Sequence, residues 1–359
     1  MKLLYAYRYG IVGGVSTQLL LRQQALKQVG IECELFFSQD NGLRQLLPSE
    51  NLVHFGSVRQ LRKLVRDKEF DAVIVIDSPE LLGAAAGSWR KRNSVYLDVH
   101  TTTQTGLSYL DSIDVHSLAG VMVPSAYSKQ LVVQRCPSWD KYLHVIPNII
   151  DSNVFTAVEH RAEPITLSAS VREFIWVGKL DHHKNWRLAL VYARLLKDLF
   201  GQIRLTVVGG YTAPAATAKD FFQLAYELEI SDSLVWLDRV ENVQLAELYR
   251  RCADTGGAML VTSRDESFGM AAAEALLCGC PLITNDLPVF REVFPESKML
   301  QRVDIWQPEQ VALAAKKIVE GISQSEKSDM RNSLHNRYGA QTFISTVKEV
   351  LQGAAKVSH

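Results

Sequence analysis

Residues 258–284 read AMLVTSRDESFGMAAAEALLCGCPLIT, and the fold prediction starts from this stretch. An apolar run up to Ser263 predicts a strand, a polar loop follows, and a helix is expected to begin near Phe268 or Gly269. A second apolar run at residues 281–284 predicts the next strand. A strand, a loop, a helix and a further strand in this order form the repeating unit of a parallel sheet.

The same alternation of apolar runs and helical periodicity covers most of the chain. It predicts an α/β protein with doubly wound parallel sheets and helices on both sheet faces. The alternation pauses in the polar, aperiodic stretch 147–173 and then starts again. We therefore expect two Rossmann-like domains, residues 1–160 and 170–337, facing a central cleft lined by the carboxyl ends of the strands. A last helix, at about 338–359, is expected to pack back on the first domain.

Composition narrows the range of functions. The chain has 359 residues, with 39 Lys and Arg against 39 Asp and Glu, so no net charge attracts nucleic acid and none is expected as a partner. Its five cysteines are odd in number and lack metal-ligand spacing, which favours a reducing compartment. No apolar run approaches the length of a membrane span. We expect a cytoplasmic protein, with peripheral association at the inner membrane face as an additional hypothesis.

The opening stretch combines an open backbone with two carboxylates. Gly269 and the alanines after Met270 would let a ligand approach the helix N-terminus, whose N–H groups and dipole favour an anion such as a diphosphate. Glu266 and Glu274 would then address hydroxyl groups at the two ends of the ligand, one on a sugar and one on a ribose. The alternative is a helix N-terminal acid at Glu266 and an exposed helix-face acid at Glu274.

Two lysines follow the strand predicted at FIWVG. Lys179 comes directly after this strand, and Lys184 lies where the next helix is expected to begin near Asn185. Cations at a strand's carboxyl end and at a helix start suit a phosphate-bearing ligand. A solvated turn with surface lysines is the alternative.

The segments VGKLDHHKN, VTSRDESFGMAAAEALLCGCPLITNDLPVFREV and HVIPNIIDSNVF resemble the retaining GT-B glycosyltransferases of family 4. Glu266 and Glu274 fit the E-x7-E signature of that family. There are two departures from its pattern: Lys179 stands where Arg is more frequent, and Ser267 where Gly is frequent.

The resemblance implies the GT-B fold and a role for each matching residue. Lys179 and Lys184 would bind the donor diphosphate, Glu266 the hydroxyls of the transferred sugar and Glu274 the ribose. His100, Lys184 and Glu266 would carry catalysis. The backbone expected to contact sugar and phosphate belongs to Phe268, Gly269, Met270 and Ala271.

The first half contributes weaker signals. Gly10, Gly13 and Gly14 do not make a G-x-G-x-x-G fingerprint, so a dehydrogenase is the least favoured function. Gly13 and Gly14 are instead similar to the family's Gly-Gly loop near donor phosphate and acceptor. A strand-to-helix turn is the alternative for this pair.

Two further residues of the first half follow strands. His100 ends a predicted strand on the same side as Asp98 and matches the family's active-site histidine, the alternative being a structural histidine. Ser125 matches a cleft segment, but a helix N-cap explains it equally.

No metal and no cofactor are expected. His182 and His183 are adjacent in a polar turn, point different ways and lack an evident third ligand. GT-B enzymes of this kind generally work without a divalent ion, and the nucleotide sugar is a co-substrate.

The predicted function is transfer of a hexose, with retention of configuration, from a nucleotide-diphosphate sugar to a hydroxyl of a saccharide or lipid-linked saccharide. UDP is the nucleotide expected from the family. The reaction is expected to belong to polysaccharide or glycoconjugate synthesis. A nucleotide-sugar-binding protein without transferase activity and a GT-B nucleotide-sugar epimerase are the alternatives.

A basic segment suggests a membrane surface as a further partner. The predicted helix at 57–70 carries several cations, and WRKRN adds Arg90, Lys91 and Arg92. Basic amphipathic helices bind anionic membranes, although a solvated helix face is the alternative. The cations of the helix are Arg59, Arg62, Lys63, Arg66 and Lys68.

Overall fold

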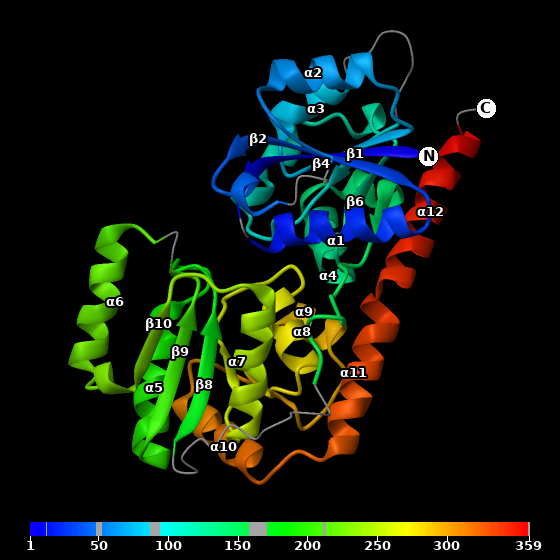
Figure 1. The fold of residues 1–359 in the computed structure, drawn as a ribbon. Helices are drawn as coiled ribbons and strands as arrows, with labels where there is room; N and C mark the ends of the chain where they lie inside the picture. The colour runs from blue at the N-terminus through cyan, green and yellow to red at the C-terminus, as the bar shows by residue number, and fades with distance from the viewer. Residues whose placement is uncertain (12, 48–51, 87–93, 158–170, 211–212, 358–359) are drawn as a thin grey trace. The chain divides into compact units, whose positions relative to one another are not determined.

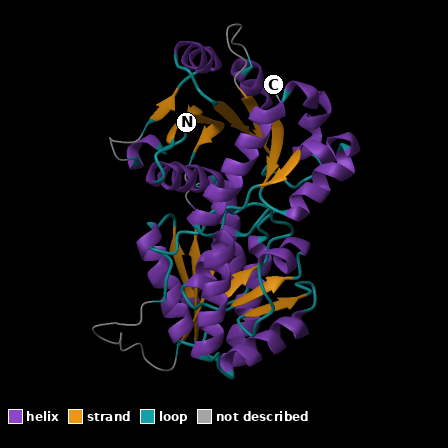
Figure 2. Cartoon of the chain, turned by 90° about the vertical axis from the view of Figure 1, so that its right-hand side faces the viewer, coloured by secondary structure: helices purple, strands orange, loops and turns teal. Residues whose placement is uncertain are grey.

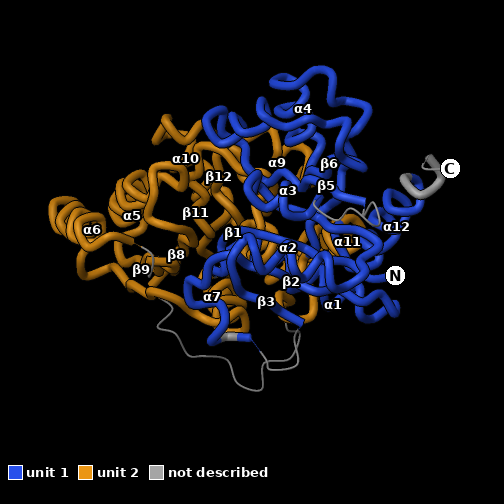
Figure 3. Tube along the Cα trace, turned by 90° about the horizontal axis from the view of Figure 1, so that it is seen from above, with its two compact units in different colours: residues 1–149, 338–359 blue, residues 150–337 orange. Residues whose placement is uncertain are grey.

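The computed structural model describes residues 1–11, 13–47, 52–86, 94–157, 171–210 and 213–357. The chain divides into two compact units, coloured separately in Figure 3. Unit 1 comprises residues 1–149 and 338–359, and unit 2 comprises residues 150–337. The expected Arg90–Arg92 cluster and residues 158–170 of the polar stretch lie outside the described residues.

Unit 1 is built on a parallel sheet that has seven strands among the described residues, in the order β3-β2-β1-β4-β5-β6-β7 (Figure 1). Strands are added on one side of β1 up to β3 and then on its other side from β4 onward, so β1 and β4 flank a topological switch point. The strands are β1 Lys2–Gly10, β2 Glu32–Asp40, β3 Val53–Phe55, β4 Ala72–Ile76, β5 Ser94–Asp98, β6 Gly120–Val123 and β7 Leu143–Val145.

Helices cover both faces of this sheet, as Figures 1 and 2 show. Successive strand side chains point to opposite faces. Tyr5 of β1 therefore packs with Leu19 of α1 and Phe343 of α12, while its neighbour Leu4 packs with Leu61 of α2. The helices of the unit are α1 Gly14–Gln28, α2 Val58–Asp67, α3 Pro79–Ala85, α4 Ala126–Arg135 and α12 Ala340–Val357, with a 3-10 helix η2 at Gly106–Ser112.

Unit 2 repeats the scheme with a six-stranded parallel sheet among its described residues, in the order β10-β9-β8-β11-β12-β13. Its switch point lies between β8 and β11. The strands are β8 Arg172–Val177, β9 Ile203–Val208, β10 Leu234–Leu237, β11 Met259–Val261, β12 Leu282–Asn285 and β13 Leu300–Val303.

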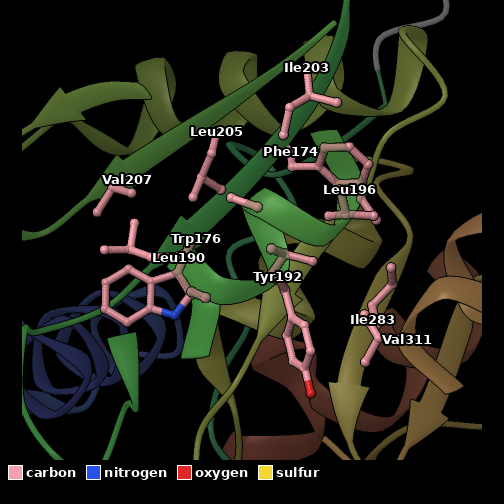
Figure 4. Close-up of a cluster of buried hydrophobic side chains, with 14 of the residues drawn as sticks. Phe174, Trp176, Leu190, Tyr192, Leu196, Ile203, Leu205, Val207, Ile283 and Val311 are labelled. Atoms are coloured by element: carbon pink, nitrogen blue, oxygen red, sulfur yellow. The ribbon is translucent and has the colours of Figure 1, made fainter. Parts of the chain in front are cut away.

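One face of the second sheet forms a large apolar cluster with its helices (Figure 4). Phe174 and Trp176 of β8 pack there with Leu190 and Leu196 of α5 and with Val311 of α10. The helices of unit 2 are α5 Trp186–Phe200, α6 Ala215–Glu227, α7 Asn242–Asp254, α8 Met270–Leu277, α9 Pro288–Val293, α10 Pro308–Val319 and α11 Gln324–Tyr338.

The prediction of two α/β domains with parallel sheets is confirmed. Two edge strands, β3 and β13, were not predicted. β3 has only three residues, all half-buried, and β13 carries the polar pair Gln301 and Arg302 at its centre, so neither is an apolar run. None of the helices in the described part of the chain combines the length and apolar character needed to cross a bilayer.

A buried ion pair and the aromatic rings beside it link four elements of unit 1. Arg22 of α1 is 1% exposed and donates to Asp98 of β5, with 2.5 Å between Nη1 and Oδ2. The guanidinium also lies over the rings of Tyr5 and of Phe343 in α12. Burial by itself would raise the pKa of the Asp98 carboxyl, but the charges of His100 and Arg22 hold that pKa well below its usual range.

We expect Arg22→Met to lower the free energy of unfolding by about 3–5 kcal/mol at neutral pH, because the Asp98 carboxylate stays buried without its partner. The depressed pKa of Asp98 makes the pair's contribution present above the ordinary carboxyl pKa and lost as pH falls below it. The difference between variant and wild type should therefore shrink toward acid pH, as measured by urea denaturation.

Arg44→Met is the matched control, since it removes an exposed pair with Asp40 in the same unit. That change should cost less than about 1 kcal/mol. Equal effects of the two substitutions would contradict the structural role of the buried pair.

Candidate functional site

Three of the residues predicted in unit 2 lie on loops at its topological switch point. β8 and β11 are neighbours in the parallel sheet, so the loops that follow them leave from the same edge. The loop after β8 carries Lys179 and Lys184, and the loop after β11 carries Glu266. Such a switch point is where open α/β sheets bind ligands.

Lys184 and Glu266 form an ion pair, with 2.5 Å between Nζ and Oε1. Ser263 adds a hydroxyl donor to the same carboxylate oxygen at 2.7 Å. Burial opposes ionisation of Glu266, but the charge and hydrogen bond of Lys184 lower the pKa of this carboxyl below its ordinary value. The side chain of Lys184 is 27% exposed and that of Glu266 13%, so both groups remain accessible to a ligand.

A buried hydrogen-bond chain fixes the two loops to each other. The indole N–H of Trp176 in β8 donates to Thr262 Oγ1 at 3.0 Å. The Thr262 hydroxyl lies 3.0 Å from the carbonyl oxygen of Lys184 and 3.1 Å from that of Asn185. This chain ties the main chain beside Lys184 to the end of β11 and so restricts where its ammonium group can lie.

The start of α8 requires glycine. Gly269 caps the helix with φ at +92°, in the left-handed region that other residues rarely adopt. A Cβ atom at this position would lie 2.4 Å from the ring of Phe290. Phe268 is buried, whereas Met270 and Ala271 in the first helical turn are half-buried. The helix was expected to begin near Phe268 or Gly269, and it begins at Met270, directly after Gly269.

Glu274 lies in a different environment from Glu266. It belongs to the second turn of α8 and is 8% exposed, so the alternative of an exposed helix-face acid does not hold. Burial, together with the nearby charge of Asp151, raises the pKa of Glu274 to about 8. A carboxyl of this kind is protonated at neutral pH and becomes a strong hydrogen-bond acceptor when it ionises.

In unit 1 the Gly-Gly turn follows β1 at its own switch point. Gly13 is the N-cap of α1 and Gly14 its first residue. A Cβ atom added at either glycine would meet no atom within 4 Å. The turn therefore presents an open backbone at the N-terminus of a helix, which suits close approach of an anionic group.

His100 follows β5 and is held at two points. Its ring Nε2 lies 3.2 Å from Asp98 Oδ2, so the two side chains are on the same side of the strand as predicted. Its main-chain N–H donates to Asp77 Oδ2 at 3.0 Å. Ser125 caps α4 by accepting the N–H of Ser128 at 3.0 Å, which fits the structural alternative for that residue.

The remaining candidate residues lie in the loop after β8 and differ in exposure. Lys179 is exposed, as is His182, while His183 is half-buried. Across the described ranges no three His, Cys, Asp or Glu side chains come together as a metal-binding group.

Sequence patterns did not reveal several residues that shape these sites. Thr262 and Ser263 stand at the end of a predicted strand and have no signature, because their roles depend on the neighbouring loop. Asp77 follows β4 in the same way. Arg22 is the one of these residues that the sequence could have indicated, because it is a charged residue in a predicted helix with mostly apolar neighbours.

Known proteins resemble part of this chain in sequence. Residues 163–337 match the family model described as Glycosyl transferases group 1. The D-inositol 3-phosphate glycosyltransferase of Xylanimonas cellulosilytica is 30% identical over 159 residues, which are 42% of this chain and 36% of that protein. The O-antigen chain mannosyltransferase RfbU of Salmonella typhimurium is 29% identical over 131 residues, 36% of this chain and 34% of that protein. The chain thus spans about a third of the length of these relatives.

Solved structures resemble the whole chain. Anabaena HepE in complex with UDP and glucose has a TM-score of 0.79 at 17% identity, covering 98% of this chain and 100% of that chain. A mutant of S. aureus TarM in complex with Fondaparinux, alpha-GlcNAc-glycerol and UDP has a TM-score of 0.75 at 9% identity, with 98% and 100% coverage. At these identities the likeness establishes the fold. Residues 163–337 are therefore similar to the glycosyl transferases group 1 family, in a chain that has the GT-B fold.

Proposed function

We propose that the protein is a retaining glycosyltransferase that moves a hexose from a UDP-sugar to a hydroxyl of a saccharide or lipid-linked saccharide. The setting proposed is polysaccharide or glycoconjugate synthesis. The group 1 domain supports transfer from a nucleotide sugar, and the UDP complexes of HepE support UDP as the nucleotide. The family 4 pattern of Glu266 and Glu274 motivates retention of configuration.

The observation that carries this proposal is the Lys184–Glu266 pair at the switch point of unit 2. A lone carboxylate beside a diphosphate would repel it, but a carboxylate already bound to a lysine leaves the site without excess negative charge. The ammonium group has three N–H donors, so Lys184 can bind a phosphate oxygen while Glu266 accepts hydroxyl groups of the sugar. One pair thereby serves both parts of the donor.

The chemical step needs charge stabilisation on the leaving group. As the bond between the anomeric carbon and the phosphate oxygen breaks, its electron pair moves to the diphosphate. Lys184, Lys179 and the N-terminus of α8 at Phe268–Ala271 are proposed to stabilise that charge. The acceptor oxygen bonds to the anomeric carbon on the same face, and its proton passes to the departing diphosphate. This route requires no divalent ion and no cofactor.

Unit 1 is proposed to supply the remaining contacts. Gly13 and Gly14 would approach the donor phosphate through their open backbone. His100, held by Asp98 and Asp77, would contact the transferred sugar. Because the family resemblance assigns these roles, each is a separate proposal that substitution can test.

Glu274 is proposed to bind the ribose hydroxyls. The carboxyl of Glu274 is buried, so it does not lie on an exposed helix face. Its raised pKa reflects the free-energy cost of holding a charge in this buried position. Hydroxyl donors from a ribose would offset that cost, because hydrogen bonds to the charged form favour ionisation.

We also propose peripheral contact with an anionic membrane at the cytoplasmic face. In α2, Leu61 and Val65 are buried, while Arg59, Arg62 and Lys63 are exposed. The cations thus line the outer face of a helix whose inner face packs in the core. Each basic residue near an anionic surface contributes about 1 kcal/mol.

Lys184→Ala should lower donor turnover by about a hundredfold or more, since the leaving group loses its positive partner. UDP-glucose, UDP-galactose, UDP-N-acetylglucosamine and GDP-mannose are screened first by calorimetry, and turnover of the bound donor is then followed with and without added saccharide. Lys197→Ala is the matched control, because this lysine lies in helix α5, which follows the loop of Lys184, and pairs with Asp232 instead. Near-normal turnover in Lys184→Ala would refute the phosphate assignment, and donor binding without any turnover would favour a binding protein.

Glu274→Gln should stabilise the protein increasingly between pH 5 and pH 8. The raised pKa means that the wild-type carboxyl favours folding while protonated, and this contribution is lost as pH rises through about 8. The glutamine cannot ionise, so the difference in unfolding free energy should grow by about 1.4 kcal/mol at most per pH unit. Urea denaturation at several pH values measures it.

The exposed Glu309 of α10 provides the control, and Glu309→Gln should leave the pH dependence unchanged. The ribose role adds a second expectation, that UDP binds Glu274→Gln about tenfold more weakly. Parallel stability curves would rule out the buried ionisation, and unchanged UDP affinity would rule out the ribose contact.

The combined change Arg59→Gln, Arg62→Gln and Lys63→Gln should weaken binding to phosphatidylglycerol vesicles about a hundredfold, as three cations are lost. Co-sedimentation at low salt measures the binding. Replacing Arg194 and Lys197, which form ion pairs in unit 2, is the control. Failure of the wild-type protein to bind such vesicles at low salt would exclude this membrane contact.

A further inference from the structure

Asp77 is the residue that follows β4 at the switch point of unit 1, and its backbone is unusual. Its φ is +39°, which makes it one of three non-glycine residues with positive φ in the described part of the chain. Such a conformation costs on the order of 1–3 kcal/mol and persists only where surrounding contacts impose it. Its main-chain N–H donates to the carbonyl oxygen of Asp98 at 3.1 Å, so the turn is anchored to β5.

The strained backbone directs the carboxyl group toward the segment after β5. Oδ2 accepts the main-chain N–H of His100 at 3.0 Å, and Oδ1 accepts the hydroxyl of Tyr109 in η2 at 2.8 Å. Asp98 meanwhile lies 3.2 Å from the ring of His100. Two carboxylates from adjacent strands thus fix the same histidine, one through its main chain and one through its ring.

We propose that Asp77 is a positioning residue of the transferase, which sets His100 for contact with the sugar part of the donor. This inference rests on the proposed function and on the role proposed there for His100. Asp77 acts through His100 and is not itself assigned a contact with the donor. Its effect should therefore appear on recognition of the sugar and not on recognition of the nucleotide.

The surroundings of Asp77 favour a strong hydrogen bond to the His100 main chain. Burial raises the pKa of the Asp77 carboxyl to about 6, while the charge of His100 and the hydrogen bond of Tyr109 limit that rise and the charge of Asp98 adds to it. Tyr7 of β1 also faces this carboxyl. In such a poorly solvated environment a hydrogen bond is stronger than in water.

Two substitutions separate positioning from charge. Asp77→Gly removes both contacts and suits the left-handed backbone, so the chain can keep its fold. Asp77→Asn also tolerates positive φ, and its Oδ1 can still accept the His100 N–H without a charge. Tyr109→Phe removes only the contact with η2 and is the matched control.

The experiment measures the dissociation constants of UDP and of UDP-glucose by calorimetry for these variants and for wild type. In Asp77→Gly, UDP should bind within about twofold of wild type and UDP-glucose about tenfold more weakly. Asp77→Asn should restore UDP-glucose binding to within about twofold, and Tyr109→Phe should not lower it. In a His100→Ala background, Asp77→Gly should have no further effect, because coupled residues are not additive.

Several results would overturn the inference. Wild-type UDP-glucose affinity in Asp77→Gly would do so, as would equal weakening of UDP and UDP-glucose, or full additivity with His100→Ala. A second measurement needs no substitution, since the amide proton of His100 should exchange more slowly with UDP-glucose bound than with UDP bound. If wild type binds neither ligand, the proposed UDP-sugar function itself is wrong, and that outcome is recognised from the wild-type protein alone.

Discussion

The constraint on which both units depend is that parallel strands cannot be joined by tight turns. Each strand must be followed by a crossover that returns the chain to the opposite end of the sheet, and helices provide it. All loops after strands therefore leave from one edge. Where the strand order changes direction, two such loops diverge and leave room for a ligand. The Gly-Gly turn and Asp77 lie at this point in unit 1, and Lys184 and Glu266 lie at it in unit 2.

Burial raises the pKa of every carboxyl at these points, and a paired cation decides whether the net shift is upward or downward. Glu266 and Asp98 are paired with Lys184 and Arg22, and each keeps a lowered pKa despite being removed from water. Glu274 and Asp77 have no such cation at hydrogen-bonding distance among the described residues, and burial raises the pKa of each. Each unit thus holds one carboxyl whose pKa is lowered by a paired cation and one whose pKa is raised by burial. A carboxylate paired with a cation suits holding neighbouring groups in a fixed orientation. A buried carboxyl with a raised pKa suits binding of a hydroxyl donor.

Much of the fold could be predicted from the sequence because the buried strands are continuous apolar runs with turn residues between them. β3 and β13 were missed because edge strands are short and half-polar. The helix start near Gly269 followed from local spacing. A shared site for Lys184 and Glu266 was expected from the family resemblance, because the two residues follow different strands, β8 and β11. Thr262 and Asp77 could not be predicted, since their partners come from other strands. The order of strands in a sheet does not follow from local sequence periodicity. The burial of Glu274 was missed for the same reason.

The return of α12 to unit 1 has a consequence for synthesis of the chain. Phe343, Val347 and Leu351 fill the cluster that contains Tyr5 and Leu19, although nearly 190 residues of unit 2 are made in between. On the ribosome, unit 2 is therefore complete before the first unit has its full core. Until α12 docks, the Phe343 ring is missing from one side of the Arg22 guanidinium. The strands of unit 1 are thus made before unit 2 but are fully covered only after it, and a nascent chain stalled before α12 presents an unfinished apolar surface to chaperones.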